Sequence, residues 1–475
     1  MIPCRRSASA IHRVACDHGQ FLILREELRE ARVAQEAFWA SSRRSSLVLG
    51  IDQIPFVCFV CSHGGISDEF LPSQLQLSAS PDDLKSSDTG KMLEQLSTQR
   101  TQRNLQLDVL RAAAILLVLV CHSRYLREPT WDLILWRPAW SGVDLFFVIS
   151  GFLISGLLFS EYRRSRQVGF LRFFIRRGFK IYPAFYATVL LTALPALMLA
   201  HGDYSRIWPP LLNDVFFLQS YREGSWGHFW SLSVEEHFYL LLPIALWFMI
   251  RFGKNTSNPF QRLPLAFLVV ASGVLLARLW TAEFVRPFQW QTHLYPTHLR
   301  LDSLLFGVLL AYYFHFHRES FSEFITNNRG KITFVGCLLL SPLLFIGQYD
   351  RWMYTWGFTG VFLGYGCLMM AFLHLDVVSG SRSINALLGA VAYIGTFSYS
   401  IYLWHIPWLK FVRALPLESV GVRLLWFYGG SIIVGIIAGE VIELPALRLR
   451  EAFFPRITRA LPVPLEEGVV PVPQP

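Results

Sequence analysis

Long runs of apolar residues, separated by short polar segments, dominate the chain from about residue 105 onward. Each run approaches the ~20 residues that a helix needs to cross the hydrocarbon core of a bilayer. Lipid offers no partner to unpaired backbone N–H and C=O groups, so each run must be helical. The pattern therefore predicts an all-α fold, a polytopic transmembrane helix bundle of about ten spans.

The orientation of these spans follows from the charge of the loops between them. The segment 161–180 carries seven basic residues and one acidic residue, whereas 201–228 carries two basic and three acidic residues. Basic loops stay in the cytoplasm, which places both termini there as well. The predicted spans lie near 105–123, 142–160, 181–200, 229–250, 264–280, 299–314, 332–347, 354–374, 393–412 and 422–442.

Composition supports a membrane protein and argues against a nucleic-acid-binding one. Hydrophobic residues make up 53% of the chain and charged residues only 16%, against about 25% charged in soluble domains. The net charge of +9 arises from basic residues in short loops between apolar runs. That placement is typical of cytoplasmic loops, so we expect no nucleic-acid partner.

Three regions differ in composition. Residues 1–91 carry scattered charges and no good span, and we expect a poorly ordered N-terminal extension, with Met92 as the hypothetical biological start. Residues 92–445 form the membrane domain. Residues 446–475 form a cytoplasmic tail that is first basic and then rich in proline.

Charged and titratable groups inside predicted spans are costly in lipid, so they are candidates for function. The opening span contains Asp108, Arg111 and His122. Helical steps of about 100° bring Arg111 and His122 to the same face, about 16 Å apart along the axis. Histidine accepts a proton near neutral pH, which favours His122 as a general base. Alternatively, Arg111 is a snorkelling anchor and His122 an interfacial histidine.

A basic segment before the third predicted span contains Arg176, Arg177 and Lys180. Arg177 and Lys180 are three residues apart and can hold phosphates together, the arginine by paired hydrogen bonds and the lysine as a point charge. Alternatively, these residues only reflect the positive-inside bias of cytoplasmic loops.

Two adjacent carboxylates, Glu235 and Glu236, open the fourth predicted span on its outer side, between Ser231 and Tyr239. Adjacent helical residues point about 100° apart, so the two carboxylates cannot share one task. We expect one of them to face the bundle interior, because a merely structural role for both is hard to motivate in lipid.

Further candidates stand in later spans. Arg300 and Asp302 begin the sixth predicted span, where either an internal ion pair or a substrate contact fits the pattern. His405 falls within the ninth predicted span, where we interpret it as a packing histidine.

Several of these residues stand in motifs that occur in a recognisable order. The motifs are Leu107–Ala114 leading to His122, Gly142–Ile154 with Asp144, Arg176–Pro183, Trp230–Tyr239 and Phe397–His405. Together they resemble the acyltransferase 3 family of integral-membrane acyltransferases, over about residues 104 to 443. The family usually has arginine where this chain has Lys180. Because the chain ends soon after the last predicted span, it resembles the stand-alone kind, without a fused esterase-like domain.

The resemblance implies an enzyme that moves an acyl group from acyl-coenzyme A (acyl-CoA) to a hydroxyl of a carbohydrate or lipid-linked glycan, with acetyl favoured over succinyl or longer groups. It implies that Arg176, Arg177 and Lys180 hold the donor phosphates and that Arg111 contacts the donor deeper in the bundle. His122 is then the general base, oriented by Glu235 or Glu236. The supporting residues are Asp108, Asp144, Ser231, Tyr239, Arg300, Asp302 and His405.

The same resemblance predicts the partners and the location. Acyl-CoA is a co-substrate, and we expect no bound cofactor and no metal. The other partners are the glycan acceptor and the lipids of a bacterial inner (plasma) membrane.

A proton-coupled transporter or flippase is the main alternative, because buried arginine, histidine and glutamate also suit proton coupling. The chain shows no inverted repeat of the kind that many transporters use, and a transporter releases no free thiol from acyl-CoA. A non-catalytic scaffold is a third interpretation, in which the substitution His122→Ala has no effect.

Overall fold

The computed structural model describes residues 88–126, 134–198, 204–253, 258–377 and 381–454, and every regular element within these ranges is helical. The all-α prediction is therefore confirmed for the described chain. The expected N-terminal extension, apart from its last four residues, and the proline-rich end of the tail lie outside these ranges. All the described residues belong to one compact unit.

The helices follow one another along the chain with short connections. They are α4 (Asp88–Ser123), η3 (Arg124–Leu126), η5 (Ile134–Ser141), α5 (Gly142–Ser165), α6 (Phe170–Met198), α7 (Trp208–Val215), η6 (Gly227–Phe229), α8 (Trp230–Phe252), α9 (Leu263–Phe284), α10 (Trp290–His293), η7 (Thr297–Leu299), α11 (Leu301–Phe316), α12 (Arg318–Leu340), α13 (Pro342–Phe345), η8 (Met353–Gly357), α14 (Phe358–Leu373), α15 (Arg382–Thr396), α16 (Ser398–Ala414), α17 (Val420–Ala438), η9 (Gly439–Glu443) and α18 (Leu444–Phe453).

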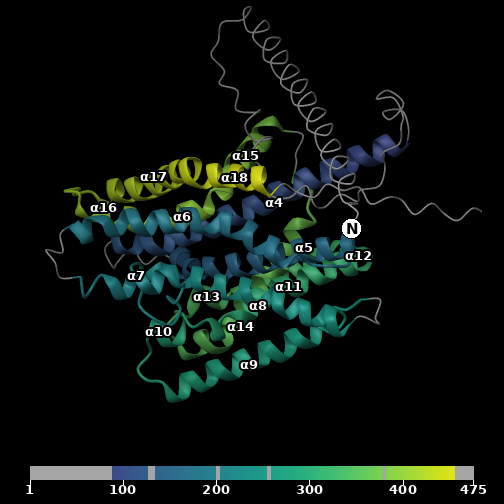
Figure 1. Ribbon diagram of the computed structural model, residues 1–475, viewed down its shortest axis with the longest axis horizontal. Coiled ribbons are helices and arrows are strands. Elements are labelled where there is room, and N and C mark those ends of the chain that lie inside the picture. Colours follow the sequence, from purple (N-terminus) through teal and green to yellow (C-terminus); the bar gives the residue numbers. More distant parts are fainter. Residues whose placement is uncertain (1–87, 127–133, 199–203, 254–257, 378–380, 455–475) are drawn as a thin grey trace, which may run out of the picture. The chain divides into compact units, whose positions relative to one another are not determined.

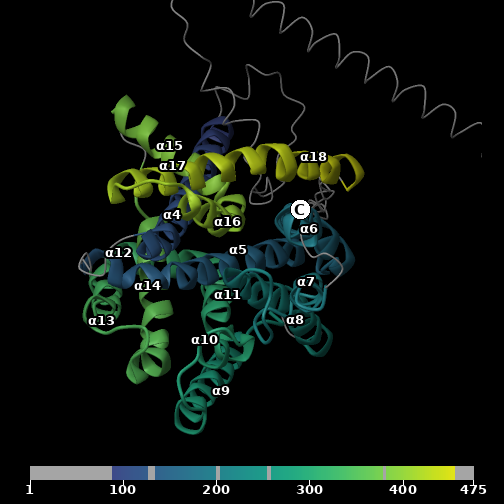
Figure 2. The same ribbon diagram turned by 90° about the vertical axis from the view of Figure 1, so that its left-hand side faces the viewer.

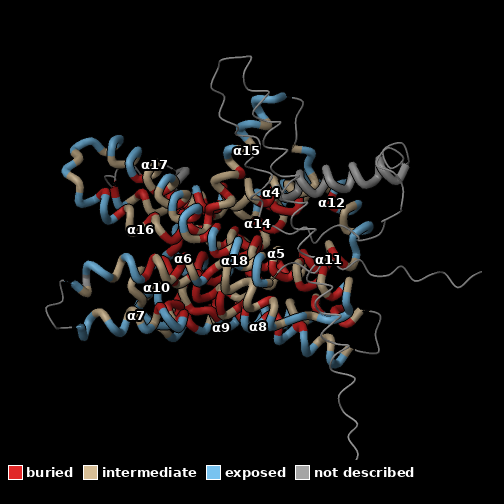
Figure 3. The backbone as a smooth tube through the Cα atoms, turned by 45° about the horizontal axis from the view of Figure 1, so that its top comes forward, coloured by how far each residue is buried: buried red, intermediate tan, exposed pale blue. Residues whose placement is uncertain are grey.

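The described helices are those of a membrane protein. Five are long and apolar enough to cross a membrane, and the number rises to six when the bent pair α15–α16 is taken as one span. The count of ten spans and the cytoplasmic position of both termini stay predictions. Figure 3 shows buried residues concentrated where α5, α6 and α8 lie, while the ends of α15 and α17 are exposed.

The basic segment before the third predicted span is helical, although the sequence analysis interpreted it as a loop. Helix α6 begins at Phe170, so Arg176, Arg177 and Lys180 lie on its first turns. A helix of 29 residues is about 44 Å long at 1.5 Å per residue, whereas the hydrocarbon core is about 30 Å thick. The basic turns can therefore extend beyond the lipid without ending the helix.

The ninth predicted span, 393–412, is not a single straight helix. Helices α15 and α16 meet at an angle of 69°, because Phe397 leaves helical geometry with φ −96° and ψ 11°. A single non-helical residue inside an apolar run does not change its hydropathy, so the sequence pattern does not detect the bend. Because of this bend, α16, which carries His405, runs in a different direction from α15.

Close backbone contacts hold the centre of the bundle together. Helix α11 contacts both α5 and α9, and Figure 1 shows α9 at the edge. A Cβ atom added to Gly151 would lie 1.9 Å from the carbonyl oxygen of Leu304, and one added to Gly307 would lie 2.3 Å from that of Val148. Reciprocal glycines thus let α5 and α11 pack backbone against backbone, as small residues do between membrane helices.

Helix α4 carries His122 into the centre of this arrangement. It contacts α5 on one side and α15, α16 and α17 on the other, and Figure 2 shows it crossing between α5 and the α16–α17 pair. The residues on α4, α6, α8 and α16 that the motifs single out are thereby brought together.

Candidate active site

His122 lies in the last turn of α4 and is partly exposed. Its Nδ1 atom lies 2.9 Å from the carbonyl oxygen of Val118, one turn earlier. A carbonyl oxygen only accepts hydrogen bonds, so Nδ1 carries the proton and Nε2 keeps its lone pair. In the neutral imidazole the basic nitrogen is therefore Nε2, the arrangement that a general base requires.

His405 on α16 supports this state of His122. Its Nδ1 lies 2.6 Å from the carbonyl oxygen of Tyr402 and must donate to it. Its Nε2 is then an acceptor and lies 3.3 Å from Nδ1 of His122. His405 is fully buried, as a packing histidine is, but it also shares the N–H of His122 with Val118. This contact holds the tautomer of His122 and helps to carry the positive charge that forms when Nε2 is protonated.

His228 in η6 completes a group of three histidines and was not singled out from the sequence. Its ring centroid lies 4.9 Å from that of His405. Its Nε2 donates to the carbonyl oxygen of Leu403 at 3.3 Å, and its buried Nδ1 has no hydrogen-bond partner in the described part of the chain. In the sequence His228 stands just outside a predicted span, where a histidine is not costly, and its nearness to the Trp230 motif was its only signal.

Ser231 joins the start of α8 to α16. The hydroxyl of Tyr402 donates to the carbonyl oxygen of His228 at 2.6 Å, so the hydroxyl of Ser231, 2.6 Å away, donates to Tyr402. Tyr402 and Ser231 are buried, and this pair fixes the position of His228 relative to His405. Ser231 thus makes a specific contact, and its supporting role stays a prediction.

The two adjacent carboxylates of α8 lie away from the histidines. Glu235 accepts hydrogen bonds from Ser150 and Tyr239, each at 2.8 Å, and Glu236 accepts one from Tyr182 at 3.2 Å. The hydrogen bonds of His122 go to Val118 and His405 instead. We predicted that Glu235 or Glu236 orients His122, and neither carboxylate contacts it in this geometry. Ser231 lies at the start of α8 beside the histidines, and the carboxylates follow about one helical turn later.

Arg177 is the basic partner of Glu235. Its guanidinium lies 3.9 Å from the Glu235 carboxylate, donates to the hydroxyl of Tyr239 and covers the Tyr239 ring at 4.1 Å from the centroid. The Arg177 side chain keeps 23% of its surface exposed. It is therefore oriented by α8 but still accessible to an anion.

Lys180 pairs with Glu443, a carboxylate that the sequence analysis did not single out. Glu443 lies in η9, is 2% exposed and also accepts a hydrogen bond from Ser400 at 2.7 Å. Lys180 lies within electrostatic reach of Asp108, which pairs with Arg111 at 2.8 Å. The structure thus brings Arg111 and Lys180 into one neighbourhood, although they come from different helices.

Arg176 belongs to a separate contact. It donates to the carbonyl oxygen of Phe454 at 2.7 Å and to the carboxylate of Glu451 at 3.0 Å, both at the end of the chain that the structure describes. Burial disfavours the charged form of Glu451, but hydrogen bonds and attraction from Arg450 and Arg176 outweigh this and lower its pKa. Arg176 therefore fastens α18 to α6, and Arg177, the next residue, faces α8.

Arg111, Arg177 and Lys180, with their carboxylate partners, form what we call the cation-lined region. Polar side chains connect this region to the histidines. The Tyr399 side chain lies within electrostatic reach of Arg177, Glu235 and Glu443. Tyr402, one turn along α16, lies within reach of Glu235 and contacts His228. We call Glu235 on α8, together with Tyr399 and Tyr402 on α16, the polar seam. It runs through a bundle whose other interior residues are mostly apolar.

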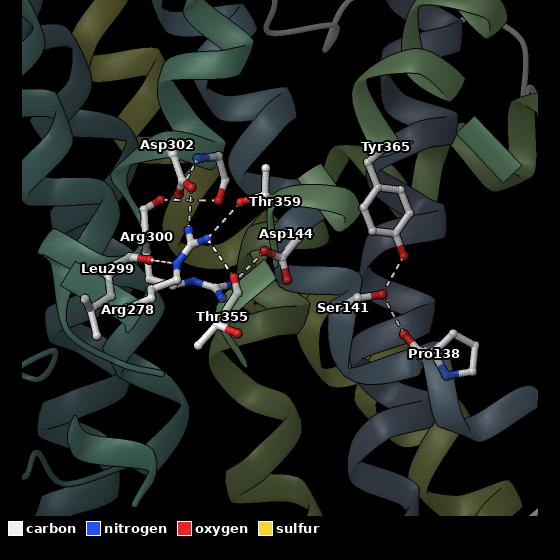
Figure 4. A network of polar contacts seen from close by, with 11 residues as sticks. Pro138, Ser141, Asp144, Arg278, Leu299, Arg300, Asp302, Thr355, Thr359 and Tyr365 are labelled. Atoms are coloured by element: carbon white, nitrogen blue, oxygen red, sulfur yellow. Dashed lines mark hydrogen bonds and ion pairs between the residues drawn. The ribbon is translucent and has the colours of Figure 1, made fainter. Parts of the chain in front are cut away.

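A second set of charges is sealed in the bundle, and Figure 4 shows it. Arg300 pairs with Asp144 at 2.7 Å, and Asp302 pairs with Arg278 on α9. All four side chains are at most 3% exposed. The sequence pattern allowed an internal ion pair between Arg300 and Asp302. The two residues do not pair with each other, and each pairs with a residue from another helix. We call these four residues the sealed ion cluster.

Arg278 is a charged residue that sequence reasoning missed. It stands within the fifth predicted span, where its charge was a signal by itself. Its guanidinium also donates to the carbonyl oxygen of Leu299 at 2.9 Å. Among the residues that the structure describes, no three His, Cys, Asp or Glu side chains form a group that could hold a metal ion.

Comparison with known proteins shows the family of the chain. Residues 104–440 match the acyltransferase domain of the acyltransferase 3 family. The O-acetyltransferase OatA of Staphylococcus aureus is 30% identical over 346 residues, which cover 69% of this chain and 54% of the relative. The peptidoglycan O-acetyltransferase OatA of Listeria monocytogenes is 28% identical over 320 residues, 63% of this chain and 48% of the relative.

The chain spans about half the length of these relatives. No solved structure matches it. The family match covers most of the chain and contains all the motifs described above. Glu443 and α18 lie beyond its last residue. The chain therefore belongs to the acyltransferase 3 family.

Proposed function

We propose that the protein moves an acyl group, acetyl by analogy with its relatives, from cytoplasmic acyl-CoA to a hydroxyl of a carbohydrate or glycoconjugate on the outer side of a bacterial inner membrane. The observation that carries the proposal is the state of His122, whose Nδ1–H is held by Val118 and His405 so that Nε2 is the free base. The names of the relatives, which include a peptidoglycan O-acetyltransferase, support a carbohydrate acceptor. The topology that goes with it has ten spans and both termini in the cytoplasm.

The donor would be bound at the cation-lined end of the polar seam. Arg177 and Lys180 share a face of α6 and are partly exposed, so phosphate oxygens can reach them. Arg111, on the same face of α4 as His122, would contact the donor further into the bundle. Arg176 would contribute less, because it is already bonded to Glu451 and Phe454.

The chemistry would be a single proton abstraction coupled to acyl transfer. Nε2 of His122 takes the proton of the acceptor hydroxyl, and the oxygen forms a bond to the thioester carbonyl carbon. The carbon–sulfur bond breaks, and coenzyme A leaves as its thiolate. The thiolate then takes up the proton that Nε2 of His122 received. A positioned base of this kind contributes about 10²–10⁴-fold to the rate. His405 is a positioning residue, since it acts through His122.

The test uses the purified full chain in lipid nanodiscs with acetyl-CoA and soluble glycan fragments from the host cell wall. We expect wild type to release free thiol and to produce an O-acetyl ester mass on the glycan. His122→Ala is expected to lower the rate of ester formation by about 10²–10⁴-fold without lowering the unfolding temperature. Equal rates for both proteins would make His122 structural, and donor-independent transport of glycan without thiol release would favour the transporter.

A second variant separates positioning from general damage. His405→Phe keeps a ring in the same space but removes the acceptor of the His122 N–H. We expect a lower kcat, an unchanged KM for the donor and a shift of the acidic limb of the pH–rate profile. A loss of rate with an unchanged pH profile would show that His405 only packs.

A further inference from the structure

Aromatic side chains gather beside His122 at the end of α4. The ring of Tyr125 stacks on His122 with centroids 6.4 Å apart. Tyr295 stacks on Trp230 at 4.9 Å with an interplanar angle of 9°. Trp290 lies 6.3 Å from Tyr295 and 5.4 Å from Tyr349. We call the five residues Tyr125, Trp230, Trp290, Tyr295 and Tyr349 the outer aromatic cluster.

Hydrogen-bonding groups accompany these rings. Arg124 donates to the hydroxyl of Tyr125 at 3.1 Å, and its guanidinium lies 5.0 Å from the ring centroid. Tyr295 lies within electrostatic reach of Tyr125, Arg124 and Tyr349, and burial together with the neighbouring phenols raises its pKa to about 12. Tyr295 therefore remains a protonated hydrogen-bond donor at physiological pH. The cluster combines flat apolar faces with phenol and guanidinium donors.

The outer aromatic cluster has a rigid support. Arg300 of the sealed ion cluster lies 5.6 Å from the ring centroid of Trp230 and 4.1 Å from that of Phe358. Its ion pair with Asp144 is buried, so the position of its guanidinium is determined. Trp230 thus lies against both a buried cation and Tyr295, so the sealed ion cluster can support the aromatic rings without contact to substrate.

These aromatic residues differ from an ordinary interfacial belt. Belt residues stand at the lipid surface and anchor a helix by themselves. Trp280 on α9 fits that description, because it is 61% exposed and its ring contact is with Phe284, one turn away. Tyr125 and Tyr349 are also half exposed, at 50% and 55%, but Tyr125 stacks on His122 and Tyr349 contacts Trp290.

We propose that the outer aromatic cluster binds a pyranose ring of the acceptor glycan and presents one of its hydroxyls to His122. The C–H face of a pyranose is apolar and packs on flat aromatic faces, while its hydroxyls need donors and acceptors at the edge. Phenols and a guanidinium beside stacked rings provide both. This inference rests on the proposed function, since it names the acceptor site that the reaction requires.

The test measures sugar binding directly, so it does not depend on turnover. The probe is chitotetraose, a neutral oligomer of N-acetylglucosamine, and binding to the full chain in nanodiscs is followed by saturation-transfer NMR in the absence of donor. The variants are Tyr349→Ala and the conservative Tyr295→Phe, with Trp280→Ala as the control from the lipid surface. His122→Ala is included to separate binding from transfer.

We expect Tyr349→Ala to weaken binding about tenfold, since an aromatic contact of this kind contributes up to about one power of ten. Tyr295→Phe removes one hydroxyl and is expected to weaken binding about threefold. Trp280→Ala should bind like wild type, and His122→Ala should bind while losing transfer. Unchanged unfolding temperatures would exclude misfolding of the variants.

Other outcomes overturn the proposal in distinguishable ways. If wild type does not bind chitotetraose, or if Trp280→Ala weakens binding as much as Tyr349→Ala, the cluster is not a saccharide site. If wild type transfers acetyl groups but the cluster variants keep their affinity for the probe and their KM for the acceptor, this inference fails and the proposed function stands. If the cluster variants lose binding although no protein transfers acetyl groups, the sugar site stands and the proposed reaction fails.

Discussion

Two regions of the bundle contain ion pairs between arginine or lysine and carboxylates, yet their exposure to solvent differs sharply. In the sealed ion cluster, Arg300 and Asp144 are 3% and 1% exposed. In the cation-lined region, Arg177 is 23% exposed and Lys180 is 30% exposed. Both sets consist of charges inside or next to apolar helices, which mark candidates for function when only the sequence is known.

The difference teaches that charge alone does not identify a ligand site in a membrane bundle. The members of the sealed ion cluster pair with one another and are at most 3% exposed, so we infer that they hold α5, α9 and α11 in register. Asp144 Oδ2 and Arg300 Nε have no hydrogen-bond partner in the described part of the chain. Arg177 and Lys180 are neutralised on one side by Glu235 and Glu443 and open on the other. Such cations are oriented in advance and can exchange contacts with an incoming anion.

The largest effect should come from breaking the sealed ion cluster. Arg300→Met leaves the Asp144 carboxylate buried without its cation, and we expect the free energy of unfolding to fall by about 3–5 kcal/mol. The matched variant Arg177→Met should cost less than about 1 kcal/mol, because the Glu235 carboxylate is 16% exposed and keeps its hydrogen bonds from Ser150 and Tyr239. Denaturation in detergent micelles measures both. Similar losses for the two variants would remove the distinction between the regions.

Arg177 should instead matter for the donor. A hydrogen bond to a charged group contributes about 1.5–3 kcal/mol, so Arg177→Met is expected to raise the KM for acyl-CoA by about 10- to 100-fold. Arg177→Lys should recover part of this loss, since it restores charge but not paired hydrogen bonds. Steady-state kinetics with varied donor, at a saturating acceptor concentration, provides the measurement. A donor KM that stays at the wild-type value would place the phosphates elsewhere.

Glu443 gives a smaller and opposite effect. Glu443→Gln removes the carboxylate that neutralises Lys180, while Ser400 can still bond the amide. A partly exposed ion pair is worth about 0.2–1 kcal/mol, so the KM for the donor should fall by roughly twofold to fivefold. The double variant Lys180→Met, Glu443→Gln is the control and should show no such gain. A higher KM in the single variant would mean that Glu443 orients Lys180 and does not compete with the donor.

The smallest effect concerns the attachment of α18 to Arg176. The pKa of Glu451 is lowered from its ordinary value of 4.5 in the folded protein. The stabilising contribution is therefore present above that value and is lost as the pH falls through the lowered pKa. We expect the protection of α18 against hydrogen exchange to decrease as the pH falls below 4.5, and Glu451→Gln to show the lower protection already at pH 7. Because this pair is at the surface, the change should be below about 1 kcal/mol.

Particular residues show how far prediction from the sequence reached. The family and the helical character followed from the ordered motifs and the apolar runs. His122 was chosen because charged groups in spans are costly, and Arg177 and Lys180 were chosen because their spacing in a basic segment suits phosphates. Glu443, His228 and Tyr399 were missed, since a residue at a span end or in an aromatic stretch has no such signal. Arg278 carried the signal and was overlooked.

The sequence by itself determined that the chain is a helical membrane protein of the acyltransferase 3 family, because hydropathy and motif order depend only on which residues occur along the chain. Only the tertiary structure decided which side chains meet. It assigned His405 to His122, Asp144 to Arg300 and Glu235 to Arg177, pairs that are 283, 156 and 58 residues apart in the chain. Helical periodicity describes one helix at a time, whereas these contacts depend on close helix packing at glycines and on the bend at Phe397.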